Sequence, residues 1–308
     1  MINASLLSDF LHLVQSRNFS ATARERRMSQ STLSRRIAQL EGFVGQPLFD
    51  RSVQPVSLTP AGETLLPLAQ DLGELMAEIH AIGHPDSRPQ QAQCTMVALS
   101  TLAMEFFPGW LSSHDRSDAP WRVNLLNTEP LLINNINNFL RGHSEFLMTF
   151  AADHVGDLHA LRYHRYIVLG QDRAQPVSAP DAEGHPVWDI DRGEALPYCA
   201  YTRGSFFQQA LAPHFERLGA RLKPVRDNSM AAVLYSMVRQ GHGMSWLPEL
   251  QIREALASGS LVRAGGPEFD LMTEIRLYRS HNLNRYAMNF WNCVSAGCEV
   301  RRKDLRLA

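Results

Sequence analysis

The chain has 308 residues, of which 44% are hydrophobic and 20% are charged, with a formal net charge of −1. This length predicts two or three compact domains, and no apolar run approaches the roughly twenty residues that a membrane span needs. Asp9 and His12 interrupt any apolar stretch at the N-terminus, so no signal peptide is expected. The four cysteines show no CxxC or zinc spacing, which indicates reduced thiols in a cytoplasmic protein without a metal site.

The first fifth of the chain has the pattern of a helix-turn-helix. Ser20 and Ser29 stand where N-caps are expected, each just before a helix-period segment. Leu33, Ile37 and Leu40 are spaced by four and three, which predicts that one face of their helix is buried. The other face begins with side chains that a recognition helix places against base edges in the major groove. These are Gln30, Ser31, Ser34 and Arg35.

This segment could be a DNA-binding unit or a small helical domain with another role, and its charge favours DNA binding. Residues 1–62 hold seven arginines and four acidic residues, a net charge of +3, whereas the remainder of the chain is net acidic. A basic head on a nearly neutral protein is the electrostatic footprint of phosphate binding. Because the segment closes with Phe49, Arg51 and the run Leu58 to Gly62, we expect a winged helix-turn-helix over residues 1–58.

A second pattern follows the wing. Thr59 suits an N-cap and Pro60 suits the first helical position. Apolar residues then recur at alternating steps of three and four, the narrow seam of a coiled coil, although Pro67 should kink the helix. The seam comprises Leu65, Leu68, Leu72, Leu75, Ile79 and Ile82. It predicts a linker helix and hinge over residues 59–89 that joins two copies of the chain, with packing inside its own domain as the alternative.

Beyond residue 94 short apolar strands alternate with helices. Strands are expected at 96–103, 123–127, 146–150, 198–201 and 244–247, and helices at 106–113, 131–141, 206–218 and 230–240. Such alternation is typical of parallel sheets covered on both faces. We expect residues 90–308 to form two α/β lobes, about 94–165 plus 268–308 and 166–267, with crossovers near 160–170 and 265–275.

The N-terminal residues quoted above, the segment Gly241 to Pro248 and the overall length resemble the LysR-type transcriptional regulators. Arg26, the run Ser34 to Ile37, and the surroundings of Tyr201 to Arg203 and of Met230 are most similar to the hypochlorite-responsive branch of that family, which would mean a role in the oxidative stress response. The resemblance implies an all-α winged helix-turn-helix, a dimerising linker helix, and two Rossmann-like lobes of periplasmic-binding-protein type. The protein would be a homodimer or homotetramer on double-stranded promoter DNA, with no cofactor and no membrane partner.

The resemblance also assigns site residues. Gln30, Ser31, Ser34 and Arg35 would face bases, while Arg36 and Arg51 would contact phosphates. A small, anionic effector would lie between the lobes at the carboxyl ends of strands, where helix starts favour an anion. The effector-binding residues would be Ser100, Thr101, Asn127, Thr128, Thr149, Tyr201, Thr202, Arg203, Asn228, Ser229, Met230 and Trp246.

Several alternatives stay open at this point. The signal could be an oxidant that converts Met230 or Met244 to the polar sulfoxide. His154, His159 and His164 recur every five residues, a step that matches neither helix nor strand and does not favour a metal site. The α/β part could instead be a solute-binding or enzymatic domain with an accessory DNA-binding head. No nucleophile elbow, P-loop or dinucleotide loop occurs, which argues against catalysis.

Overall fold

The computed structural model describes residues 4–53, 55–83, 93–114, 121–192, 195–218, 221–296 and 298–300. Contacts divide the chain into one unit of residues 1–89 and a second of residues 90–308. The end of the predicted linker and hinge segment, residues 84–89, lies outside the described residues. The two units are described separately below.

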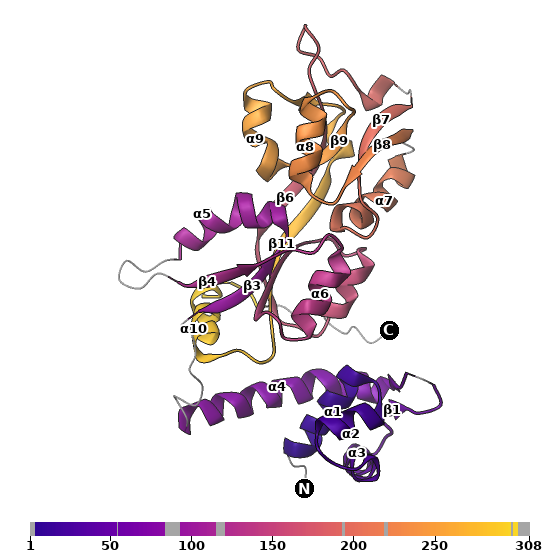
Figure 1. Ribbon diagram of the computed structural model, residues 1–308, viewed down its shortest axis with the longest axis vertical. Coiled ribbons are helices and arrows are strands. Elements are labelled where there is room, and N and C mark those ends of the chain that lie inside the picture. Colours follow the sequence, from indigo (N-terminus) through magenta and orange to yellow (C-terminus); the bar gives the residue numbers. More distant parts are fainter. Residues whose placement is uncertain are drawn as a thin grey trace. The chain divides into compact units, whose positions relative to one another are not determined.

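The N-terminal unit is a helical bundle with a small wing (Figure 1). Its elements are α1 (Ala4–Ser16), α2 (Phe19–Glu25), α3 (Gln30–Val44), β1 (Phe49–Asp50), β2 (Ser57–Leu58) and α4 (Pro60–Gly83). β1 and β2 pair antiparallel, so the predicted wing is present. The predicted helix face of Leu33, Ile37 and Leu40 is completely buried, as the helical spacing requires.

The second unit consists of two lobes connected by two long strands. Its elements up to the crossover are β3 (Cys94–Ala98), the π-helical turn η1 (Leu102–Phe106), α5 (Phe107–Ser112), β4 (Val123–Leu126), α6 (Leu132–Leu140), β5 (Phe146–Ala151) and η2 (Gly156–Leu161). The remaining elements are β6 (Tyr166–Ser178), η3 (Ile190–Arg192), β7 (Leu196–Tyr201), α7 (Phe206–Leu218), β8 (Leu222–Asn228), α8 (Ala231–Arg239), β9 (Ser245–Pro248), α9 (Glu249–Ala257), β10 (Val262–Arg263), η4 (Pro267–Phe269), β11 (Leu271–Arg279) and α10 (Arg285–Val294).

The two expected α/β lobes are present, but the main sheet is mixed and not parallel throughout. β3 pairs parallel with β4 and β5, but β11 pairs antiparallel with β5 and with β6. The segments expected as plain crossovers are these long strands, and Figure 1 shows β6 and β11 running between the lobes. The end of β6 pairs antiparallel with β9 and β10, whereas β7 and β8 form a separate parallel pair. Each lobe therefore shares the same two strands, which makes β6 and β11 the mechanical link between lobes.

Two glycines, Gly241 and Gly243, form the turn between α8 and β9. Gly241 adopts φ +77° immediately after the helix, the left-handed conformation expected at C′. Gly243 has φ +157°, and a Cβ on it would lie 2.7 Å from the carbonyl oxygen of Pro197. Only glycine lets the chain pass this close to β7. The turn delivers Met244, whose backbone bridges to Tyr198 of β7.

Candidate DNA-binding and effector sites

The recognition helix α3 is held at its start by its own hydroxyl cap. Ser29 Oγ accepts the N–H of Thr32 at 3.1 Å, so the predicted cap is confirmed. Gln30, Ser31 and Arg35 are exposed and Ser34 is half-buried, while the apolar face packs inward. Among the described residues no hydrogen bond or ion pair involves the Arg35 side chain. α3 can therefore present a polar first turn, followed by the positive charge of Arg35, to a nucleic acid.

The predicted cap of α2 needs correction. α2 begins at Phe19, and its N-cap is Asn18, whose Oδ1 accepts the N–H of Ala21 at 3.0 Å. Ser20 lies inside the helix, and its hydroxyl donates to Oε1 of Gln30 at 2.9 Å. The helix starts earlier than expected because an asparagine side chain caps as well as serine. Ser20 instead orients a predicted base-reading residue.

Arg36 is bound to a buried carboxylate within its own unit. Its Nε donates to Asp9 of α1, and its terminal nitrogen lies 2.6 Å from Ser5 Oγ. Asp9 is fully buried and also accepts from Arg26 Nε at 2.9 Å. Asp9 thus ties α2 and α3 to α1. The sequence analysis missed this role, although an aspartate at helical spacing from the apolar residues Leu6 and Leu13 is a usable signal.

The wing residue Arg51 is also engaged. Its guanidinium donates to Glu41 at 2.9 Å and to Ser34 Oγ at 3.3 Å, and it lies over the Phe19 ring at 5.1 Å. Glu41 in turn accepts the N–H of Leu48 at 2.9 Å. These contacts fasten the wing to α3. The Arg51 side chain remains 43% exposed, so it can still contact a ligand from solvent.

The linker helix has two apolar faces. Thr59 Oγ1 accepts the N–H of Gly62 at 3.1 Å, which confirms the predicted cap, and α4 runs unbroken through Pro67. Leu66 and Ala69 are buried against the helix-turn-helix. Leu68 is 62% exposed and Leu72 is 37% exposed, on a different face of the helix. Leu65 is half-buried, and the side chains of Leu75, Ile79 and Ile82 lie outside those described.

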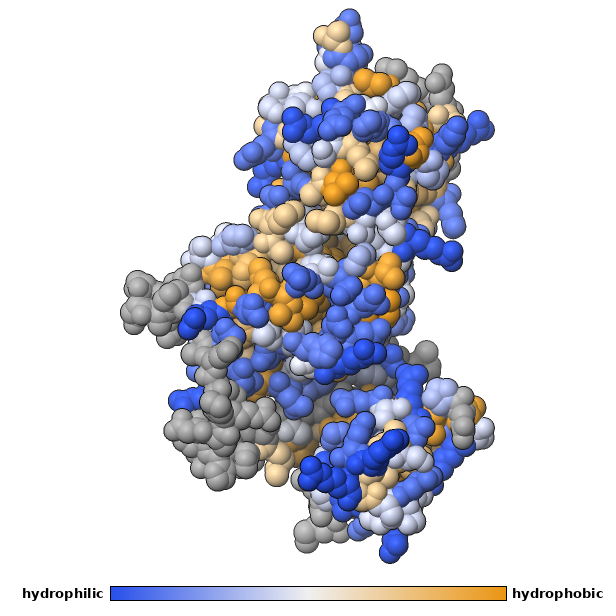
Figure 2. All heavy atoms as spheres, in the orientation of Figure 1, coloured by the Kyte–Doolittle hydropathy of each residue, from blue (hydrophilic) through white to orange (hydrophobic). Residues whose placement is uncertain are grey.

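A cavity of about 470 Å³ lies within the second unit at the junction of its lobes. It is lined by the ends of β3, β4 and β5 on one side and by the starts of α7 and α8 on the other. The lining residues are Leu99, Ser100, Thr101, Ala103, Met104, Leu125, Leu126, Asn127, Thr128, Glu129, Pro130, Leu132, Phe150, Ser205, Phe206, Phe207, Ser229, Met230 and Ala231. Figure 2 shows an apolar surface over α5 and β4, beside this region.

Half of the predicted effector residues line this cavity. They are Ser100, Thr101, Asn127, Thr128, Ser229 and Met230. The others lie outside its lining: Thr149, Tyr201, Thr202, Arg203, Asn228 and Trp246.

Packing explains most of these placements. Thr149 and Trp246 are fully buried, and each bonds a backbone carbonyl, of Phe150 and Phe269 respectively. Thr202 bonds Asp227 and Asn228 accepts the N–H of Met230, whereas Arg203 is exposed. Alternation along a strand determines which side chain reaches a cleft, and the expected strand ends were not precise enough to fix that alternation.

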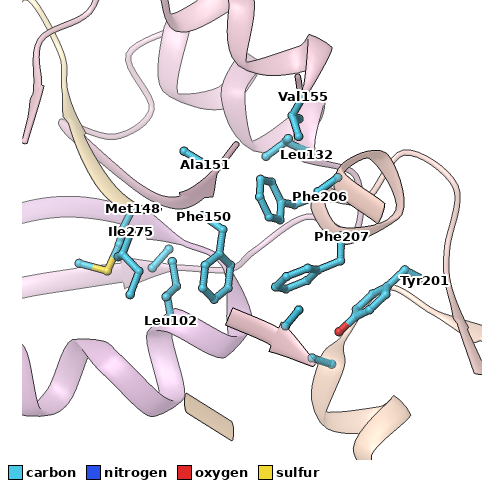
Figure 3. Close-up of a cluster of buried hydrophobic side chains, with 14 of the residues drawn as sticks. Leu102, Leu132, Met148, Phe150, Ala151, Val155, Tyr201, Phe206, Phe207 and Ile275 are labelled. Carbon is cyan, nitrogen blue, oxygen red and sulfur yellow. The ribbon is translucent and has the colours of Figure 1, made fainter. Parts of the chain in front are cut away.

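The sequence analysis missed the aromatic floor of the cavity. Phe150 of β5 lies 5.8 Å from Phe206 and 5.0 Å from Phe207, measured between ring centroids. Figure 3 shows these rings side by side, with Tyr201 beyond Phe207. Two adjacent phenylalanines that follow Gly204 and Ser205 at the start of α7 are the signal that could have placed aromatic rings at this end of the helix.

Titratable groups near the lobes are buried rather than activated. Burial raises the pKa of the Cys94 thiol to about 12 and raises the pKa of Cys199 as well, so both thiols stay protonated and unreactive. Burial also raises the pKa of Asp172, in β6, to about 6. Within the described residues no three His, Cys, Asp or Glu side chains gather where a metal ion could bind. No helix in that part is long and apolar enough to span a bilayer.

The methionines differ in access to solvent. Met230 is 40% exposed and Met104 is 48% exposed at the cavity, but Met244 is fully buried. An oxidant in solution therefore reaches Met230 and Met104 more readily than Met244.

Residues 5–63 match the family "Bacterial regulatory helix-turn-helix protein, lysR family", and residues 151–299 match "LysR substrate binding domain". The HTH-type transcriptional regulator YjiE of Escherichia coli is 27% identical over 94% of this chain and 93% of its own length. Vibrio fischeri DarR, solved in complex with DNA, is 27% identical with a TM-score of 0.56, covering 96% of this chain and 98% of that one.

The hypochlorite-specific regulator HypT of Salmonella typhimurium is 23% identical with a TM-score of 0.56, covering 96% of this chain and 98% of that one. That likeness shows the fold alone. Relatives that match this chain over more than 90% of its length are named as transcriptional regulators, so the alternative of an enzyme with a DNA-binding head does not hold. The helix-turn-helix, the two-lobed α/β unit and both family matches lead to one conclusion: the chain belongs to the LysR family of DNA-binding transcriptional regulators.

Proposed function

We propose that this regulator acts in the cytoplasm as a homo-oligomer on promoter DNA and reads bases with the first turns of α3. The observation that best supports base reading is that Arg35 is exposed and has no side-chain partner among the described residues, because such a guanidinium can bond guanine in two places. Gln30, Ser31 and Ser34 share its turns of the helix. Arg36 and Arg51 would contact phosphates with the guanidinium N–H groups that their contacts to Asp9 and Ser5, and to Glu41 and Ser34, do not use.

Operator binding of Arg35→Ala tests this assignment. Loss of a bidentate base contact should weaken binding by about 1–3 kcal/mol and relax base preference at one position. Arg51→Ala should weaken all DNA alike and flatten the salt dependence. Arg239→Ala, an exposed arginine of α8, is the control. Gel shifts in which Arg35→Ala binds its operator as tightly as the parent protein would remove α3 from the base contacts.

The second part of the proposal concerns the signal. An effector in the interlobe cavity would favour one arrangement of the lobes, because its contacts come from both sides of the junction. β6 and β11, shared by the lobes, would bend with that change. A useful switch needs about 1–3 kcal/mol of coupling between effector and DNA. The expected anionic effector could not rely on Arg203, which lies outside the cavity lining, and would depend on hydroxyls and helix starts.

Filling the cavity tests its role without knowledge of the effector. Leu126→Trp places an indole in the space, so a promoter reporter should no longer respond to the natural signal. Val187→Trp, at an exposed position outside the cavity lining, is the control. A reporter that responds normally in Leu126→Trp would place the sensor elsewhere.

An oxidant signal is the second candidate, favoured by the exposure of Met230 at the cavity. Sulfoxide formation there would put a polar group at the start of α8. Met230→Leu should then abolish an oxidant response, whereas Met272→Leu, an exposed methionine of β11 outside the cavity, should not. Equal oxidant responses in both variants would exclude Met230 as the sensor.

A further inference from the structure

The interlobe cavity combines an apolar floor with a cluster of hydroxyl groups. The rings of Phe150, Phe206 and Phe207 form the floor and come from both lobes (Figure 3). An apolar cavity of about 150 Å³ already accommodates benzene. A volume of about 470 Å³ therefore has room for an aromatic ring or branched chain together with a polar group.

The hydroxyl of Ser205 is a buried polar group in the lining of this cavity. Ser205 is 4% exposed, lines the cavity and precedes α7, a helix of thirteen residues. Among the described residues nothing hydrogen-bonds to its Oγ. A buried hydroxyl without a partner costs free energy, so a ligand that bonds it is favoured. The first N–H groups of α7 lie beside it, before the helix's own hydrogen bonds begin.

Most of the other polar groups of the lining are also neutral. Ser100, Thr101 and Ser229 bring further hydroxyls, and Thr101 is 4% exposed. Hydroxyl and N–H groups can all donate to an anion, and a helix start carries partial positive charge. Among the described lining residues, Glu129 is the one charged side chain, and it is negative. The neutral donors at the start of α7 can thus bind a ligand with one negative charge. A second negative charge on the ligand would be repelled by Glu129, and the described residues of the lining include no cationic side chain to offset it.

We infer that the cavity selects a small monocarboxylate with an apolar, ring-sized body. Its carboxylate accepts from Ser205 Oγ and from the start of α7, and its body packs on Phe150, Phe206 and Phe207. The inference rests on the proposed function of this cavity as the effector site, and it adds the chemical class of the effector.

Three probes with the same phenyl body separate the charge states: 3-phenylpropionate, 3-phenyl-1-propanol and phenylsuccinate. Titration calorimetry on the full-length protein should give the monocarboxylate an affinity at least about tenfold higher than either the alcohol or the dicarboxylate. Ser205→Ala should lower the affinity for the monocarboxylate about tenfold and leave that for the alcohol nearly unchanged. Ser236→Ala, an exposed serine of α8 outside the cavity, should change neither.

The inference is overturned if the alcohol or the dicarboxylate binds as tightly as the monocarboxylate, if Ser205→Ala weakens all probes equally, or if none of the three binds at millimolar concentration. The cavity-filling variant Leu126→Trp keeps this failure distinct from failure of the proposed function. A Leu126→Trp reporter that has lost its response would show that the cavity is the sensor although its ligand belongs to another class.

Discussion

Replacing Asp9 with asparagine would remove the charge that holds three helices of the DNA-reading unit together. The Asp9 carboxylate is fully buried and accepts from Arg26 Nε at 2.9 Å and from Arg36 Nε. Breaking a buried ion pair by removing one partner typically costs about 3–5 kcal/mol. The two arginine side chains are 28% and 29% exposed, so water can partly replace the lost bonds. We therefore expect a loss of about 2–3 kcal/mol, somewhat below that range.

Amide hydrogen exchange of the full chain measures this loss locally, since tryptophan fluorescence reports only on residues 90–308, where all five tryptophans lie. Amides in the interior of α3 should exchange roughly 30- to 160-fold faster in Asp9→Asn, the factor that corresponds to the expected free energy. Operator affinity should fall with it, because a loosened α3 is less well placed. Glu25→Gln, an exposed acid at the end of α2, is the control. Exchange in α3 that is unchanged in Asp9→Asn would refute the assignment of Asp9 as the structural tie.

Three further predictions follow from particular contacts. In Gly62→Ala the new Cβ would lie 2.2 Å from the Leu48 carbonyl oxygen, and the substitution should destabilise the N-terminal unit by about 1–3 kcal/mol. In Gly42→Ala the new Cβ has nothing within 4 Å, so this variant should stabilise α3 by about 0.5–1 kcal/mol. Hydrogen exchange that ranks the two variants the other way would contradict the reasoning. The raised pKa of Asp172, about 6 when folded against 3.8, means that the folded state holds its proton more tightly, so stability should fall as pH rises from about 4 to about 6. That fall amounts to up to about 3 kcal/mol and should vanish in Asp172→Asn, as urea denaturation followed by tryptophan fluorescence can check; an equal fall in both proteins would place the titration elsewhere. Leu72→Asp puts a charge on the exposed face of α4 and should reduce self-association and operator binding together, and an unchanged sedimentation coefficient would take α4 out of the interface.

Local sequence pattern was sufficient to predict the recognition helix, the wing and the start of the linker helix. The spacing of Leu33, Ile37 and Leu40, the caps at Ser29 and Thr59, and the wing were all predicted from the sequence and are present in the fold. Short helices with caps depend on neighbours three or four residues away, which a single sequence displays directly. Several helices of the second unit, such as α7 at Phe206–Leu218, were predicted for the same reason.

Interactions between residues distant in the sequence were decided only by the tertiary structure. The sequence analysis expected crossovers where β6 and β11 form a long antiparallel pair, because strand pairing joins Tyr166 to Tyr278 and nothing local records that partner. The same holds for Asp9, whose partners lie 17 and 27 residues away, and for the cavity floor, where Phe150 meets Phe206 and Phe207. A sequence specifies helix faces and caps through short-range periodicity, whereas which side chains converge in a cleft depends on strand register and on how the lobes pack.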